Sequence, residues 1–304
     1  MRKTDLLLCL PVLALLTMAS CQTMESAATL ATAVGQGAGV ISGSQAESIR
    51  KTSRAVSRSA EEFTPEQEYY IGRSVGAVVL AKYPAYDTSQ VNQYVNLIGQ
   101  TLAQASDLPG IFGGYHFLVL DSDEINAFAT PSGLIFVTRG LLRCCRNEDA
   151  LAAVLAHEIG HIERRHGMKA IQKARVTEAL TTLATEGAKT FGSREVAALT
   201  QTFGGTITDI TNTMINKGYS RSSEYEADKA AVVLLRRVGY DPNGLVEMLT
   251  AMKKNLKAGR LDFAKTHPAP GDRIAEIQRV GLRYATLPAP AERQKRFQQT
   301  LGKI

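Results

Sequence analysis

The 304-residue sequence is poor in several residue types, and each shortage narrows the possible functions. It has no tryptophan, and its aromatics amount to only 6% and form no stacking platform for single-stranded nucleic acids. Lys and Arg number 35 against 29 Asp and Glu, a mild excess that gives a net charge of +6. We therefore expect no nucleic-acid partner. Hydrophobic residues make up 44%, which is ordinary for a globular protein.

No hydrophobic run is long enough to span a bilayer as a helix. The apolar stretch 6–16 has 11 residues, and a spanning helix needs about 20. Two basic residues precede it, and the small residues Ala19 and Ser20 come directly before Cys21, which predicts a secretory signal peptide over residues 1–20. Residues 18–21 resemble a bacterial lipobox, with Met18 in place of the usual Leu. The resemblance implies lipidation of Cys21; ordinary signal cleavage beside an incidental Cys is the alternative.

The residue after Cys21 bears on the compartment. In bacterial lipoproteins an Asp there tends to mean inner-membrane retention, and this chain has Gln22. The resemblance therefore implies an outer-membrane lipoprotein that faces the periplasm, with the membrane as partner through Cys21. Residues 21–62 have no core pattern and are predicted to be a flexible tether. The alternative is a helix that packs closely against another helix in lipid, since Gly35, Gly39 and Gly43 recur at every fourth position.

Few cysteines remain after the signal peptide. Cys144 and Cys145 are adjacent in the sequence, and two neighbouring side chains cannot readily bind one metal ion. In an oxidising compartment they are either two unpaired thiols or members of a disulfide, and we expect the thiols.

The folded domain is predicted for residues 63–282, followed by a C-terminal tail or helix at 283–304. Thr64 is a candidate N-cap, with Pro65 in the first turn and Gln67 as its capping-box partner. The patterns predict helices over about 64–82 and 89–105, strands over 115–120 and 134–138, and mostly helix from residue 147. No internal repeat is present. The sequence therefore predicts a mostly helical α+β fold.

Three of the five histidines lie within ten residues. His157 and His161 are four residues apart in His-Glu-Ile-Gly-His, so on a helix they share a face and can bind one metal ion. Asn147 is the expected N-cap of that helix. Glu158 adjoins the first ligand and can accept a proton from a water molecule without binding the metal itself. Two buried histidines without a metal are the alternative.

A hydrolytic zinc site needs a third protein ligand and one open position. We expect that ligand to be Glu224, because a carboxylate on the apolar face of a helix needs a positive partner. Asp228, one turn on, can accept the second N–H of a ligand histidine. His166 does not fit the metzincin ligand spacing and is predicted to support the site by hydrogen bonding. The alternative for Glu224 is a buried ion pair with Arg221, which we also place beside the site.

Four separated motifs resemble one family, the gluzincin peptidases of the HtpX and CAAX prenyl protease type (peptidase family M48). They are Asn126–Gly133, His157–His161 with its trailing His166, Glu224-x-x-Ala227-Asp228, and Thr266-His267-Pro268 with Arg273. Ser132 departs from the family's Gly. The resemblance implies a zincin-like domain, one Zn²⁺ per chain, and a small sheet whose edge strand borders the cleft. It is strongest to the periplasmic lipoprotein branch, without the tetratricopeptide domain of some members.

The strand 134–138 comes just before the metal helix, and we expect it to be the sheet edge that pairs with an extended substrate. A plain core strand is the alternative. The predicted substrate-binding residues are Asn126, Ala127, Phe128, Gly133, Leu134, Ile135, Phe136 and Val137. His267 is a candidate catalytic residue that either donates to the oxyanion or occupies the open zinc position; a surface role is the alternative. Residues 187–219 are either a lid or an ordinary loop.

These expectations combine into one main function. With His157, His161 and Glu224 on zinc and Glu158 as general base, we expect an endopeptidase that cleaves unfolded or misassembled envelope proteins. The outer-membrane assembly machinery is a possible partner. A chaperone-like factor that binds extended chains with little cleavage is the second hypothesis. A basic lipoprotein that contacts anionic lipid is the third.

Overall fold

The computed structural model describes residues 21–39, 41–60, 63–172, 218–255, 267–280 and 284–304. They belong to two compact units, one drawn from 1–62 and 171–205 and the other from 63–170 and 206–304. The predicted signal peptide lies outside the described residues. Among the helices of the described ranges, none combines the length and the apolar character that a membrane span requires.

The first unit contains a helical hairpin of α2 (Cys21–Gly37) and α3 (Gly43–Ala60). The segment predicted as a flexible tether forms these two helices, whose many Ala and Ser residues permit close packing without a large apolar core. Gly39 has a φ of 71° in the connecting turn, and a Cβ atom at Gly35 would lie 3.0 Å from the side chain of Ile41. Gly39 thus serves the turn, and Gly35 leaves room for the connecting residue Ile41 to pack on α2.

The second unit contains a three-stranded sheet with the order β1-β3-β2. β1 (His116–Leu120) is parallel to β3 (Leu134–Thr138), and β2 (Ala127–Ala129) is antiparallel to it. The prediction that β3 is the sheet edge is therefore wrong, because β3 has a partner on both sides. The edge strand beside the helix α7 (Glu148–Glu163) is β2, which has only three residues and too little alternation to be recognised in the sequence.

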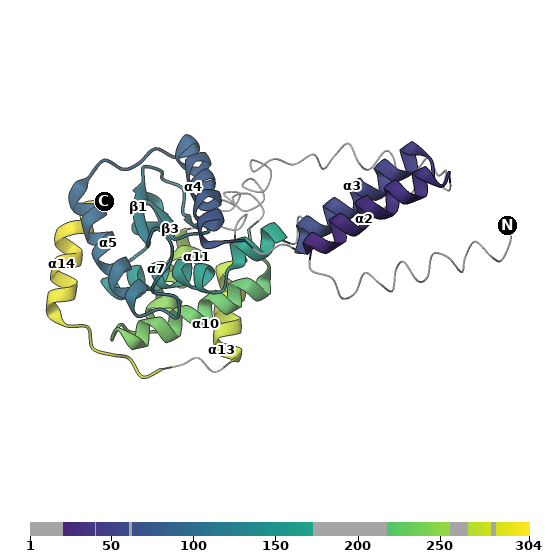
Figure 1. The fold of residues 1–304 in the computed structure, drawn as a ribbon. Helices are drawn as coiled ribbons and strands as arrows, with labels where there is room; N and C mark the ends of the chain where they lie inside the picture. The colour runs from purple at the N-terminus through teal and green to yellow at the C-terminus, as the bar shows by residue number, and fades with distance from the viewer. Residues whose placement is uncertain (1–20, 40, 61–62, 173–217, 256–266, 281–283) are drawn as a thin grey trace. The chain divides into compact units, whose positions relative to one another are not determined.

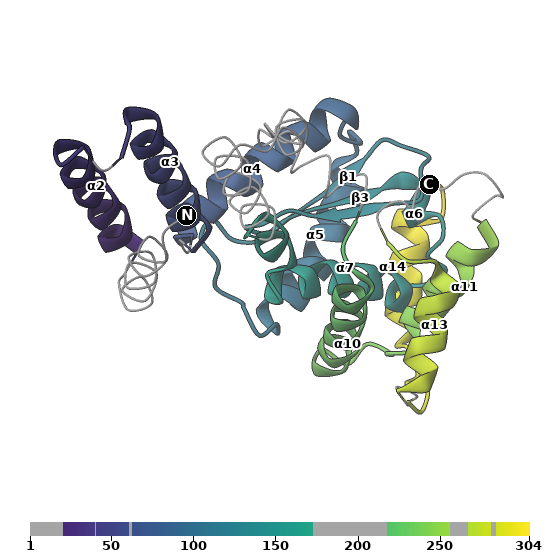
Figure 2. The same cartoon turned by 90° about the vertical axis from the view of Figure 1, so that its right-hand side faces the viewer.

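Side chains alternate between the two faces of this sheet. Val119, Ile135 and Val137 face α5 (Ser89–Gln104) and α7 and belong to the main core. The opposite face carries Phe128 and Phe136, which pack with Val79 and Tyr83 at the end of α4 (Pro65–Lys82). The predicted Thr64 capping box is confirmed, since the Thr64 hydroxyl accepts from the Gln67 N–H and the Gln67 side chain accepts from the Thr64 N–H. Figure 2 shows α7 between the sheet and the C-terminal helices.

The remaining elements are α6 (Arg139–Leu142), α10 (Arg221–Arg237), α11 (Gly244–Asn255), α13 (Pro270–Arg279) and α14 (Ala291–Leu301). Both α10 and α11 pack on α7, and α14 lies beside α5 (Figure 1). The segment predicted as a tail or helix is thus helical, and its Phe297 and Leu301 enter the main core. Cys144 and Cys145 are buried and free, as expected. The predicted α+β, mostly helical fold is confirmed.

Candidate metal centre

The two histidines of the His-Glu-Ile-Gly-His motif lie on one face of α7. The helix begins at its predicted cap, where the Asn147 side chain accepts from the Ala150 N–H at 2.8 Å. One turn of helix separates His157 and His161, and their Nε2 atoms are 3.1 Å apart. Both side chains are buried, at 3% and 2% exposure. Their remaining ring nitrogens, Nδ1, point to other partners, so both Nε2 atoms can serve one ion.

Glu224 reaches these histidines from α10, which begins after the N-cap Ser220. Its Oε2 atom lies 3.4 Å from His157 Nε2, and its Oε1 atom lies 3.4 Å from His161 Nε2. The two helices come this close because residue 160 is glycine: a Cβ atom there would lie 3.0 Å from the carbonyl oxygen of Ala227. The glycine inside the motif therefore positions a ligand from a different helix.

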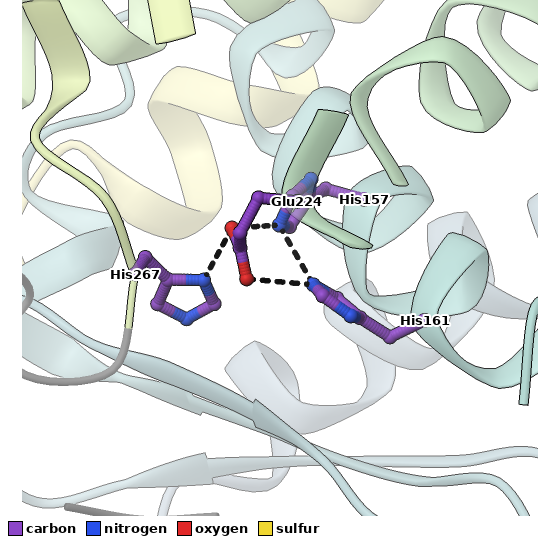
Figure 3. Close-up of side chains that lie close together, drawn as sticks. All are labelled: His157, His161, Glu224 and His267. Atoms are coloured by element: carbon purple, nitrogen blue, oxygen red, sulfur yellow. Dashed lines mark hydrogen bonds and ion pairs between the residues drawn. The ribbon is translucent and has the colours of Figure 1, made fainter. Parts of the chain in front are cut away.

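His267 joins the group from the segment just before α13. Its Nδ1 atom lies 2.9 Å from Glu224 Oε2, and the side chain is buried (Figure 3). One donor atom from each of His157, His161, Glu224 and His267 lies within 4.8 Å of all the others. Two imidazoles, a carboxylate and a third imidazole are a donor set that suits a transition-metal ion such as zinc.

The charges at this cluster favour a cation. Burial raises the pKa of Glu224, but the three neighbouring histidines outweigh it and hold the pKa well below its ordinary value. Glu224 is therefore ionised, and its buried Oε1 atom accepts no hydrogen bond within the described part of the chain. Burial lowers the pKa of His161, which keeps that ring neutral and able to coordinate. An unsatisfied carboxylate oxygen facing the neutral His161 imidazole fits a bound divalent ion.

The far side of His157 is held by a buried ion pair. Its Nδ1 atom lies 2.9 Å from Asp228 Oδ1, and the Arg273 Nε–H donates to Asp228 Oδ2 at 3.0 Å. Burial raises the pKa of Asp228, yet Arg273 and His157 lower it to about 2. Burial and Arg273 lower the pKa of His157, but hydrogen bonds with Asp228 and Glu224 raise it to about 9. The carboxylates thus favour positive charge at this ring, from a proton or from a metal.

The far side of His161 leads to a second chain of contacts. Its Nδ1 atom lies 2.9 Å from His166 Nδ1, and His166 Nε2 lies 3.3 Å from Glu226 Oε2. Burial, with the neighbouring His161, lowers the pKa of His166 to about 4, so this ring is neutral. Tyr219 stacks on the His161 ring at a centroid distance of 4.5 Å. The Glu226 side chain is half exposed, yet its carboxylate reaches the buried His166 ring.

Two other predicted site residues, Glu158 and Arg221, differ in how deeply they are buried. Glu158 is buried on α7. Burial raises the pKa of Tyr219, and the nearby carboxylates of Glu158 and Glu224 raise it further. The placement of Arg221 beside the site is wrong: its side chain is 75% exposed and pairs with Asp272 at 3.8 Å. Arg221 lies in the first turn of α10, where its side chain extends toward solvent. The lid predicted over 187–219 lies, up to residue 217, outside the described residues.

One site residue was missed as such by the sequence analysis. Arg273 was noted only as part of a motif, although it is fully buried and grips Asp228 with two nitrogens. A signal did exist, since an Arg on the apolar face of a predicted helix needs a buried acidic partner.

Comparison with known proteins agrees with the geometry. A sequence model of peptidase family M48 matches residues 89–280. The chain is 31% identical over 220 residues to the beta-barrel assembly-enhancing protease of Escherichia coli (strain K12), covering 69% of this chain and 42% of that protein. It is 30% identical over 202 residues to the mitochondrial metalloendopeptidase OMA1 of Schizosaccharomyces pombe, covering 64% and 54%. It is 28% identical over 163 residues to the metalloprotease LoiP of Escherichia coli, covering 54% and 61%.

The helix-borne His-Glu-x-x-His motif and the carboxylate from a second helix define a metallopeptidase. The chain belongs to peptidase family M48. The predicted family is thus confirmed, while the chain spans about two fifths of the length of the assembly-enhancing protease that it matches.

Proposed function

We propose that this protein is a zinc-dependent endopeptidase in which His157, His161 and Glu224 hold one Zn²⁺ per chain. The observation that carries the proposal is the convergence of these three side chains, with the buried Glu224 Oε1 atom left without a hydrogen bond. Two imidazoles and a carboxylate leave one position open, as hydrolytic zinc sites require.

A bound zinc ion supplies Lewis-acid polarisation of a peptide carbonyl and makes a water molecule more acidic. Glu158, next to the first ligand, accepts the proton of the attacking water and passes it to the leaving amine. Asp228, fixed by Arg273, accepts the Nδ1–H of His157 and so keeps Nε2 free for coordination.

His166 plays the corresponding part for the second ligand. With His161 Nε2 turned to the metal, its Nδ1–H donates to His166 Nδ1, and the His166 Nε2–H donates to Glu226. This sequence of bonds fixes the tautomers of both rings. We therefore assign His166 and Asp228 to the same task, the orientation of a ligand ring.

Substrates pair with β2, the edge strand next to α7. Asn126 and Thr130 bond toward β3, because the Thr138 N–H donates to the Asn126 carbonyl and the Thr130 N–H donates to the Leu134 carbonyl. Backbone groups alternate in direction along an antiparallel strand, so those of Ala127 and Ala129 face away from β3. An extended chain bonded there is selected for being unfolded rather than for its sequence.

Unfolded or misassembled envelope proteins are the substrates that this selection suits, and a bacterial relative is named a beta-barrel assembly-enhancing protease. Signal-like residues 1–20 and the lipobox-like Cys21 support a lipid anchor in the outer membrane, facing the periplasm. In that position the outer-membrane assembly machinery is the natural partner.

His267 is assigned to the open position of the metal. Its Nδ1 atom is as close to Glu224 as a ligand imidazole would be, so a bound His267 would exclude water and hold the enzyme latent. Replacement by alanine is then expected to raise peptide hydrolysis several-fold at equal zinc content. A fall in kcat with an unchanged KM would contradict latency and support the alternative, in which His267 donates to the oxyanion.

The proposed activity is tested by Glu158→Gln, with Glu292→Gln on an 80%-exposed side chain as the matched control. We expect the first variant to keep its zinc and lose casein cleavage by at least 10²-fold, because the general base is gone. The control should cleave like the wild type. Equal absence of cleavage in all three proteins, with zinc bound, would overturn the proposal in favour of a chaperone-like factor that binds extended chains.

A further inference from the structure

A cavity of about 280 Å³ lies next to the metal cluster. The start of α4, the loop around residues 108–112, the turn from β2 to β3 and the end of α7 form its walls. His161 and Tyr219, which contact each other beside the metal donors, also line it. The cavity is thus continuous with the metal centre and with the Ala129 end of β2.

The wall of this cavity is largely apolar. Ile162 and Met168 are buried at 7% and 3% exposure, while Phe112, at 46% exposure, stands among the exposed large apolar side chains. The edge of the Phe112 ring meets Tyr69 at a centroid distance of 5.3 Å. A concave apolar wall next to a catalytic centre is suited to an apolar group of the substrate.

Two of the three charged residues that line this wall neutralise each other. Arg165 forms an ion pair with Glu68 of α4, and Glu163 accepts the backbone N–H of Asp107 at 2.7 Å. The Glu68 side chain is 19% exposed and that of Arg165 54% exposed, so the pair lies toward the mouth. The wall therefore has no unpaired cation among its described residues, and the remaining carboxylate, Glu163, already accepts a hydrogen bond.

The backbone of the wall is strained at two places. Among the described residues, Ser132 and Arg165 alone are non-glycine residues with a left-handed backbone, at φ 71° and 54°. Both line this cavity. Arg165 follows the cap of α7, where glycine is usual, and Ser132 holds its position by bonding the Tyr69 carbonyl of α4 at 3.4 Å. Strain of this kind concentrates at ligand-binding sites.

We propose that this cavity binds one large apolar side chain, of the size of Phe, Leu or Met, from the residue beside the scissile bond of the substrate. The inference rests on the proposed peptidase activity, since it assigns a subsite to that same centre. Pairing with β2 recognises backbone only, so this cavity supplies the side-chain preference.

The test uses quenched fluorescent peptides that are identical except for Phe or Ala at each position next to the cleaved bond. Wild type is expected to prefer Phe at one of these positions by at least tenfold in kcat/KM. Leu108→Trp and Met168→Trp, which fill the cavity from two sides, should each lower kcat/KM for the Phe peptide to the level of the Ala peptide. The control is Leu97→Trp on an exposed face of α5.

A binding experiment separates this proposal from the activity. Zinc-loaded Glu158→Gln should bind the preferred Phe peptide at least tenfold tighter than the Ala peptide, and added Leu108→Trp should abolish the difference. Selective binding without any wild-type cleavage would refute the peptidase and leave the subsite intact. Equal binding of both peptides, or equal loss for both peptides on filling the cavity, would overturn the subsite; melting temperature and zinc content verify that each variant is folded.

Discussion

Arg273 shows how much of a metal site depends on a residue that never touches the metal. Its side chain is fully buried, 45 residues from its partner Asp228, and it is the cation that keeps this carboxylate ionised next to His157. Removal of one partner from a buried ion pair leaves an uncompensated charge, which is more costly than replacing the whole pair. Its contribution should therefore appear both in stability and in metal affinity.

We expect Arg273→Met to lower the free energy of unfolding by about 3 to 5 kcal/mol and zinc affinity by about 10- to 100-fold. Urea unfolding and competition with a zinc chelator measure the two effects. Arg279→Met, on the same helix but with 71% exposure, should change neither by much, since surface pairs contribute about 0 to 1 kcal/mol. Unchanged chelator competition in Arg273→Met would show that Asp228 orients His157 without it.

At this scale the sequence was informative wherever helix geometry relates neighbouring positions. The spacing of His157 and His161 placed both rings on one face, and the apolar stripe of α10 singled out Glu224. The sequence predicted a supporting role for His166 but not its hydrogen-bond partners. The prediction for Arg221 was wrong, because the partner of an exposed arginine is set by tertiary contacts. Asp272 comes from α13, which no local pattern relates to α10.

Among the elements, β2 has the most specific consequence for substrates. Its three residues pair with β3 on one side. The backbone groups of Ala127 and Ala129 point to the other side, away from β3. The sequence located β3 correctly in the chain but wrongly in the sheet. Because both faces of β3 are buried, its sequence is a continuous apolar run. Such a run indicates that the two faces are covered, but it does not indicate whether the strand has a hydrogen-bonding neighbour on each side.

In the proposed pairing with β2, only every second backbone group of the substrate forms a hydrogen bond, so N-methylation of substrate amides should act with a period of two. We expect methylation at one set of alternate positions to lower kcat/KM by about tenfold, roughly the value of one hydrogen bond. Methylation at the other set should have little effect. A peptide series with single N-methyl groups measures this without altering the enzyme. Equal effects at successive positions would contradict strand pairing.

For the molecule as a whole, the last helix is part of the catalytic unit. Glu148, at the start of α7, accepts hydrogen bonds from Tyr94 of α5 and Tyr240 at 2.7 and 2.8 Å and forms an ion pair with Arg296 of α14. The sequence left this last segment as a tail or helix because its polar composition shows only a narrow apolar stripe. Its role comes from the ion pair of Arg296 with Glu148, which lies 148 residues earlier in the chain.

The pH dependence of stability should reveal this contact. Burial raises the pKa of Glu148, but Arg296 and the two tyrosines outweigh it and lower the pKa below its ordinary value of 4.5. The stabilisation is then complete above pH 4.5 and is lost as the pH falls through the lowered pKa. We expect Glu148→Gln to cost about 3 kcal/mol at pH 7, and its difference from wild type to narrow below pH 4.5.

Urea titrations between pH 7 and pH 3 measure that difference. Glu292→Gln on the same α14 helix removes an exposed carboxylate and should stay within about 0.5 kcal/mol of wild type at each pH. A constant gap between Glu148→Gln and wild type down to pH 3 would show that the pKa of Glu148 is not lowered by folding.

The spread of the site along the chain also governs when it can form. A ribosome releases His157 and His161 well before Glu224, and Arg273 and Arg296 emerge last of all. A nascent or prematurely terminated polypeptide that ends before residue 224 has no third donor for the ion. The proposed hydrolytic centre therefore cannot form until the chain has been synthesised beyond Glu224, so an incomplete chain would not cleave its neighbours.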